Sequence, residues 1–138
     1  MSDNTCIFCK IVNGEIPSRT IYEDDDLKAF LDVNPATKGH VLIIPKEHSR
    51  DLHDLPDATA EKVIKLAKRI AAKLKEELGC DGINILQNNG QTAGQTVFHY
   101  HLHIIPRYED DKNDDILRWN VTKVSDEEMG HLVSKLKL

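Results

Sequence analysis

The chain has 138 residues, which is the size of one ordinary domain with a hydrophobic core of its own. Hydrophobic residues make up 40% of it and charged residues 30%, and no apolar run approaches the roughly 18 residues of a membrane span, so the composition excludes a disordered chain and a membrane protein. Its 18 Lys and Arg against 23 Asp and Glu give a net charge of −5, which excludes a protein that coats nucleic-acid phosphates. The N-terminal residues lack the basic and apolar regions of a secretory signal, and we expect a cytoplasmic protein.

Five short runs of apolar and β-branched residues, each bounded by Asp, Asn, Gly or Pro, predict five strands. They cover residues 20–23, 27–32, 40–45, 83–88 and 97–105. No repeat or linker divides the sequence, so we expect one domain over residues 1–138.

A long helix is expected between the third and fourth strands, beginning near Pro56 and stopping at Gly79. Its apolar residues recur at steps of three and four along one face: Val63, Ala67, Ile70, Leu74 and Leu78. A second helix follows Ser125, which can form a capping box with Glu128, and its apolar stripe is Met129, Leu132, Val133 and Leu136. Strands and helices mix without strict alternation, which predicts an α+β domain with an antiparallel sheet of about five strands and both helices packed on one face.

Three of the seven histidines fall within five residues, at positions 99, 101 and 103. Alternate side chains of a strand share a face at intervals of roughly 6.6–6.8 Å, so these three would project together. Phe98, Tyr100, Leu102 and Ile104 would bury the opposite face. The residues alone allow a polar strand face, a three-histidine metal site or a catalytic face.

A specific resemblance narrows this choice. The segment His99-Tyr100-His101-Leu102-His103-Ile104-Ile105 matches the His-φ-His-φ-His-φ-φ signature of the histidine-triad family of nucleotide hydrolases and transferases. Four further segments are similar to the family pattern and stand in the family order: Cys6-x-x-Cys9-x5-Glu15-Ile16-Pro17, Ala29-Phe30-Leu31-Asp32, Gly39-His40-Val41-Leu42-Ile43-Ile44-Pro45-Lys46-x-His48 and Asn88-Asn89-Gly90. The likeness covers about residues 5–108, and the tail 109–138 carries no diagnostic match.

The resemblance implies a covalent mechanism at a phosphate. His101 is at the position of the nucleophile, which would attack the α-phosphate of a nucleotide and form a nucleotidyl-histidine that water then hydrolyses. His103, Gln95 and the hydroxyl of Thr96 are at positions that stabilise charge on the phosphate and the leaving group, although many relatives carry Ser in place of Thr96. His40 is at a position that can hydrogen-bond His103; it could also be a plain histidine at a strand end.

The resemblance also implies a nucleoside pocket. Asp32 would accept hydrogen bonds from the ribose hydroxyls, and Asn88 would donate to a ribose or phosphate oxygen. The candidate wall residues for the base are Phe8, Ile16, Leu31 and Val33, each of which could equally be ordinary core.

Cys6 and Cys9 form a Cys-x-x-Cys pair, which is a weak signal by itself because redox motifs, half zinc sites and inert pairs all show it. The resemblance implies a structural zinc site made of Cys6, Cys9, His48 and His99, as in family members that keep the cysteine pair. Cys80 is expected in the core.

The expected protein is therefore an enzyme that hydrolyses nucleoside phosphoramidates or dinucleoside polyphosphates, with an adenosine-containing substrate. Ile104-Ile105-Pro106-Arg107 is more similar to the polyphosphate branch of the family, whereas Gly94-Gln95-Thr96 fits the phosphoramidase branch equally well. The alternatives are a nucleotide-binding regulatory module with little turnover and a zinc-dependent interaction domain. The resemblance implies a homodimer, built on the long helix and an edge strand, and Trp119 either anchors the tail or is a core residue.

Overall fold

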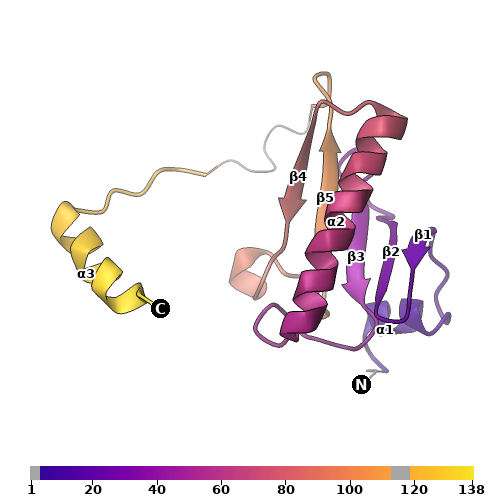
Figure 1. The fold of residues 1–138 in the computed structure, drawn as a ribbon, viewed down its shortest axis with the longest axis horizontal. Coiled ribbons are helices and arrows are strands. Elements are labelled where there is room, and N and C mark those ends of the chain that lie inside the picture. Colours follow the sequence, from indigo (N-terminus) through magenta and orange to yellow (C-terminus); the bar gives the residue numbers. More distant parts are fainter. Residues whose placement is uncertain (1–3, 113–118) are drawn as a thin grey trace.

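The computed structural model describes residues 4–112 and 119–138 (Figure 1). Along the chain, the elements are α1 (Ile7–Val12), β1 (Thr20–Glu23), β2 (Leu27–Leu31), β3 (Val41–Pro45), α2 (Asp57–Leu78), β4 (Gly82–Leu86), a 3₁₀ turn (Gln91–Ala93), β5 (Leu102–Arg107) and α3 (Asp126–Leu136). The strands form a five-stranded sheet in the order β1-β2-β3-β5-β4, and every neighbouring pair is antiparallel. The predicted α+β class and antiparallel sheet are confirmed.

Helix α2 lies across one face of the sheet, over β3 and β5 (Figure 1). It ends at Gly79, whose φ of 61° is the left-handed conformation that glycine adopts readily. Its buried residues are Val63, Leu66, Ala67, Ile70 and Leu74, which adds Leu66 to the predicted stripe and leaves Leu78 at the exposed end. Each fully buried aliphatic side chain stabilises the fold by about 1.5–3 kcal/mol, so this stripe holds the helix on the sheet.

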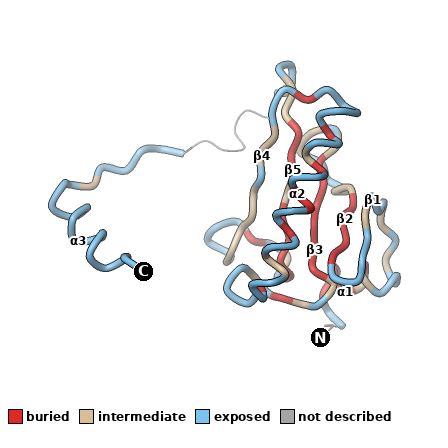
Figure 2. The backbone as a smooth tube through the Cα atoms, viewed as in Figure 1, coloured by how far each residue is buried: buried red, intermediate tan, exposed pale blue. Residues whose placement is uncertain are grey.

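The strand residues divide between two buried clusters, one on each face of the sheet. Leu27, Ala29, Val41, Ile43, Leu102 and Ile104 pack with α2, together with Cys80, whose predicted core position is confirmed. Phe30, Leu42 and Ile44 face the other way and pack against Phe8, Cys9 and Ile11 of α1. Because both faces are covered, the central strands are buried along almost their whole length (Figure 2).

Two local predictions are wrong near the histidines. Strand β5 begins at Leu102 and not at residue 97, so His99 and His101 lie in the segment that leads into the strand. Phe98 is 39% exposed, and Cζ of Arg50 lies 4.9 Å from the centre of its ring. Phe98 therefore does not belong to the buried face opposite the histidines. Helix α1 was not among the predicted elements; Cys6 caps its N-terminus, a position usually held by Ser, Thr, Asp or Asn.

The C-terminal helix forms as predicted but does not pack on the sheet. The Ser125 hydroxyl accepts a hydrogen bond from the Glu128 amide at 3.2 Å, as the capping box requires. Helix α3 nevertheless has no buried residue and lies beyond the β4 edge of the sheet (Figure 1). Trp119 is 79% exposed, so it is neither a core residue nor an anchor on the body of its own chain. Within the described residues, every helix is too short or too polar to cross a membrane.

Candidate active site and metal centre

The candidate active site lies on the face of the sheet opposite α2. In the sheet register, His103 of β5 is directly across from Leu42 of β3 on one side and from Leu86 of β4 on the other. Leu42 is in turn opposite Phe30 of β2, so His103 shares its face with the α1 cluster. The short helix α1 therefore forms one wall beside the histidines.

The His101 ring is fixed by a main-chain carbonyl. Its Nδ1 lies 2.8 Å from the carbonyl oxygen of His99, and since a carbonyl only accepts, Nδ1 carries the proton and donates it. Nε2 is left with its lone pair. Burial lowers the pKa of His101, so the ring is neutral at pH 7. A neutral imidazole with a free Nε2 lone pair is what a histidine nucleophile needs.

A chain of three hydrogen-bonded groups orients His103. The Ala36 amide donates to Nδ1 of His40 at 2.9 Å, so the proton of His40 is on Nε2. That Nε2 lies 2.9 Å from Nδ1 of His103 and donates to it, which leaves His103 with its own proton on Nε2. Burial lowers the pKa of His40, and it lowers the pKa of His103 to about 4. His103 is thus a neutral donor beside His101, with 5.1 Å between the two ring centres.

Asp32 lies beside His40, the middle member of this chain. One carboxylate oxygen accepts from the Asn34 amide at 2.9 Å, and the other is 3.6 Å from Nε2 of His40. A side chain that is 17% exposed keeps lone pairs for a ligand. Asn88 is also free to donate, since its amide has only a 3.5 Å contact with the Gly94 carbonyl.

Gln95 is placed differently from the prediction. Its side chain is buried, its Oε1 accepts from the Gly90 amide at 2.8 Å, and its two amide protons go to the carbonyls of Arg50 and Val97 at 2.8 and 3.0 Å. With its donors used in this way, Gln95 holds the loop before the histidines and is not a direct donor to phosphate. Thr96 is exposed, and its hydroxyl has no hydrogen-bond partner within the described part of the chain.

The predicted base wall is only partly assembled. Phe8 is buried with its ring centre 5.1 Å from that of His101, and Ile16 packs against the same cluster. Val33 is 75% exposed next to Asp32. Leu31 packs with the α2 cluster on the other face of the sheet, so its predicted role in the wall is wrong. Alternation along β2 explains this, because Phe30 on the site side forces its neighbour to the opposite side.

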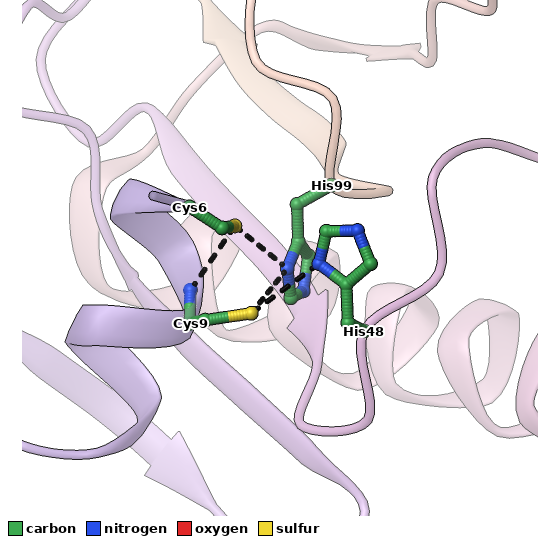
Figure 3. Close-up of side chains that lie close together, drawn as sticks. All are labelled: Cys6, Cys9, His48 and His99. Atoms are coloured by element: carbon green, nitrogen blue, oxygen red, sulfur yellow. Dashed lines mark hydrogen bonds between the residues drawn. The ribbon is translucent and has the colours of Figure 1, made fainter. Parts of the chain in front are cut away.

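A second cluster joins the four residues predicted to bind metal (Figure 3). The Sγ of Cys6 is 3.3 Å from Nδ1 of His99, and the Sγ of Cys9 is 3.3 Å from Nδ1 of His48 and 3.5 Å from that of His99. All four ligand atoms lie within 4.8 Å of one another. Ligands of a tetrahedral zinc ion are about 3.6 Å apart, given Zn–S near 2.3 Å and Zn–N near 2.1 Å. The donor set and its spacing therefore fit zinc.

The surroundings of the cluster favour a metal over redox chemistry. The Nε2 of His99 donates to the Pro45 carbonyl at 2.8 Å, which leaves the Nδ1 lone pair pointing at the sulfurs, and burial lowers the pKa of His99 to about 4. Burial raises the pKa of the Cys6 thiol, and a zinc ion would supply the positive charge that holds the thiolate form.

Some groups of the site were outside the reach of sequence reasoning. The Ala36 amide and the His99 and Pro45 carbonyls orient three rings, yet main-chain groups are the same at every residue. The pairing of Arg107 is a further contact that no motif indicates. Its guanidinium bonds Asp111 at 2.7 and 3.0 Å and Asn84 at 2.9 Å, and since Arg107 ends β5, the spacing rule for charge pairs on a helix does not apply.

Known proteins with similar sequences cover most of the chain. An uncharacterised HIT-like protein of Methanocaldococcus jannaschii is 54% identical over 77% of this chain and 81% of its own length. An adenosine 5′-monophosphoramidase of Saccharomyces cerevisiae is 42% identical over 97% of this chain and 82% of its own. An adenylylsulfatase of Arabidopsis thaliana is 44% identical over 78% of this chain and 55% of its own.

Solved structures agree in fold. A HIT family protein from Bacillus anthracis matches 99% of this chain and 96% of its own with a TM-score of 0.89 at 40% identity. A Zn-bound histidine triad family protein from Mycobacterium smegmatis matches 95% and 97% with a TM-score of 0.75, also at 40% identity. The family model of the HIT domain matches residues 13–110. The chain therefore belongs to the HIT domain family, the histidine-triad proteins that its sequence resembles.

Proposed function

We propose that the protein hydrolyses adenosine 5′-phosphoramidates through a nucleotidyl-histidine at His101. As a HIT family nucleotide hydrolase it acts at the α-phosphate of its substrate. The observation that carries the proposal is the 2.8 Å hydrogen bond from Nδ1 of His101 to the His99 carbonyl, which leaves Nε2 as a free nucleophile.

The reaction takes place in two displacements at phosphorus. In the first, the Nε2 lone pair attacks the α-phosphorus, an Nε2–P bond forms, and the P–N bond to the leaving amine breaks, with the amine taking a proton from solvent. The ring becomes cationic, and the His99 carbonyl stabilises it through the Nδ1 proton. In the second, water attacks phosphorus and the Nε2–P bond breaks, which releases adenosine monophosphate and restores His101.

His103 stabilises the charge on the phosphate. Its Nε2 proton is directed outward by the chain from Ala36 through His40, so the donor is in place before substrate binds. Such a donor needs no rearrangement as charge builds up. Asp32 accepts from the ribose hydroxyls, Asn88 and Thr96 donate to oxygens of the substrate, and Phe8, Ile16 and Val33 contact the base.

An amine leaving group is favoured over a second nucleotide. In the polyphosphate-like segment, Arg107 already bonds Asp111 and Asn84, so it would have to leave these partners to bind the additional phosphates of a dinucleoside polyphosphate. The monophosphoramidase of Saccharomyces cerevisiae, which matches 97% of this chain, supports the same choice.

Cys6, Cys9, His48 and His99 would hold a structural zinc ion. With four protein ligands there is no open position for a substrate, so its role is to tie α1 to the loops after β3 and before β5. The thiols must stay reduced to bind it, which suits a cytoplasmic protein. We further propose a homodimer, in which the free β4 edge and α2 contribute the interface.

The test compares substrates and follows the intermediate. Turnover of adenosine 5′-phosphoramidate should exceed that of diadenosine tetraphosphate, and acid quenching with α-³²P substrate should trap label on the protein. Faster turnover of the polyphosphate would overturn the choice of leaving group. Nucleotide binding without label or turnover would instead identify a regulatory module.

A further inference from the structure

The face of the sheet that carries α2 is open beside β1 and the end of β2. Helix α2 packs most closely on β3 and β5, and Ile21, Tyr22 and Leu31 remain incompletely buried beside it. A groove of about 610 Å³ runs there along α2. Its apolar lining includes Ile21, Tyr22 and Leu31 of the strands and Leu66, Ile70 and Leu74 of α2. Ile21 is 49% exposed in it.

Helix α3 carries an apolar stripe that no described part of its own chain covers. Met129, Leu132, Val133 and Leu136 are 51%, 37%, 55% and 71% exposed, and no residue of the helix is buried. It has 11 residues, with Gly130 in its interior. Isolated helices shorter than about 12–15 residues are marginal in water, and an interior glycine costs about 1 kcal/mol more. This helix therefore needs a packing partner.

The groove and the helix match in length and charge. The groove follows α2 from Leu66 to Leu78, a rise of about 18 Å, and α3 is about 16 Å long. The groove is lined by three basic residues and one acidic residue, Lys38, Arg69, Lys73 and Glu77, whereas the first turn of α3 is acidic at residues 126–128. The groove and the helix thus match in length, and the net charge of the groove is opposite to that of the first turn of α3.

The position of α3 points away from the groove of its own chain. The groove lies at the β1 and β2 side of the sheet, and α3 lies beyond β4, the strand at the opposite edge (Figure 1). The solved Bacillus anthracis structure matches 99% of this chain, a share that includes α3. A helix that has no buried residue and lies away from the groove of its own chain needs a partner outside that chain.

We propose that α3 of one chain docks in the α2 groove of a second copy, and that the second copy returns the same contact. The stripe of Met129, Leu132, Val133 and Leu136 then fills the partner's groove along α2. The interface is reciprocal, so it closes on a dimer and does not propagate. It goes beyond the proposed homodimer, because a dimer joined only at β4 and α2 would leave both α3 helices exposed.

Site-directed cross-linking tests this contact in the full-length, metal-loaded protein. A ¹⁵N-labelled Ile21→Cys chain is mixed with an unlabelled Val133→Cys chain, allowed to exchange subunits, and treated with a short bismaleimide. The expected product joins one labelled and one unlabelled chain through residues 21 and 133. His131→Cys in place of Val133→Cys puts the thiol on the other face of α3 and should lower the yield at least about fivefold. The unsubstituted chain controls for Cys6, Cys9 and Cys80.

Hydrogen exchange gives an independent measurement. Amides of α3 should exchange at least about tenfold more slowly in the unsubstituted protein than in Leu132→Asp, because the undocked helix is marginal. A cross-link within one chain of the double variant would overturn the proposal in favour of docking on its own body. Absence of the mixed product, or equal exchange in Leu132→Asp, would also overturn it, while a dimer that persists in Leu132→Asp leaves the proposed homodimer intact.

Discussion

His99 and His101 are two residues apart, both buried, and they present opposite nitrogens. His99 donates from Nε2 to the Pro45 carbonyl and turns its Nδ1 lone pair toward two thiols. His101 donates from Nδ1 to the His99 carbonyl and keeps its Nε2 lone pair for a substrate. The residue type and the burial are the same, so the role of each ring is decided by the carbonyl that binds its other nitrogen.

The largest loss of turnover is expected when the nucleophile is removed. His101→Ala should lower turnover by at least about 10⁴-fold, because no other group in the site forms the covalent intermediate. Circular dichroism should show an unchanged fold. His131→Ala, at an exposed histidine of α3, is the matched control and should keep full activity. A labelled nucleotidyl adduct on His101→Ala would refute the assignment.

At the metal cluster, Cys9→Ser should remove the metal and leave most of the fold. Elemental analysis of untagged protein should give one zinc per chain before the substitution and less than about 0.2 after it. The melting temperature should fall by at least about 5 °C, with α2 and the face of the sheet under it intact because the cluster between them does not include Cys9. Activity should also fall, since the carbonyl that orients His101 belongs to a ligand residue. Cys80→Ala, in the core away from the cluster, should keep its zinc.

The neighbouring donor is expected to matter less than the nucleophile. His103→Ala should lower turnover by about 10²- to 10³-fold, the usual cost of one preorganised donor. Rapid-quench experiments should still find the labelled adduct, which separates this variant from His101→Ala. Complete loss of the adduct in His103→Ala would mean that the two rings act as one unit.

Asp32 probes the nucleoside end of the site. Asp32→Ala should weaken nucleotide binding by about 1.5–3 kcal/mol, or roughly 10- to 150-fold, if the carboxylate accepts two hydrogen bonds from the ribose. Calorimetry with the 2′,3′-dideoxy analogue is the control, because the variant should no longer distinguish it from the natural nucleotide. Equal affinity of the unsubstituted protein for both would remove Asp32 from the site.

The smallest effect concerns acid stability. The pKa of His103 is about 4 in the folded protein and about 6.5 when unfolded, so between these values the unfolded chain binds more protons. The contribution of His103 to the free energy of unfolding should therefore be constant above about pH 7 and fall as the pH drops from about 6.5 to 4. Urea titrations of His103→Asn should show a shallower fall than the unsubstituted protein, and equal slopes would contradict this origin.

Patterns in the sequence predicted those features of the helices that depend on residues close together in the chain. The steps of three and four in α2, its stop at Gly79 and the cap at Ser125 were read correctly because they depend on nearby residues. The start of β5 was not, since hydrogen bonds to β3 and β4 define it and these strands are far away in the chain. Family resemblance located the four metal-binding candidates, and the structure brings them together.

Two site predictions failed for physical reasons that no motif records. Leu31 follows Phe30 on a strand, so the two cannot face the same pocket. The side chain of Gln95 hydrogen-bonds three main-chain groups, the Gly90 amide and the Arg50 and Val97 carbonyls. These bonds use its donors, so it does not face the substrate. In both cases the direction of the side chain depends on groups that the rest of the fold places beside it.

The orientation of the rings by Ala36, Pro45 and His99 has an evolutionary consequence. Each of these contacts uses a main-chain amide or carbonyl, and mutation of the side chain there does not delete that group. Substitutions around the pocket can therefore accumulate and change which leaving group is accepted while the protonation pattern of the histidines is inherited unchanged. Proteins that share this site can therefore differ in the leaving group that they accept while they keep the same histidine chemistry.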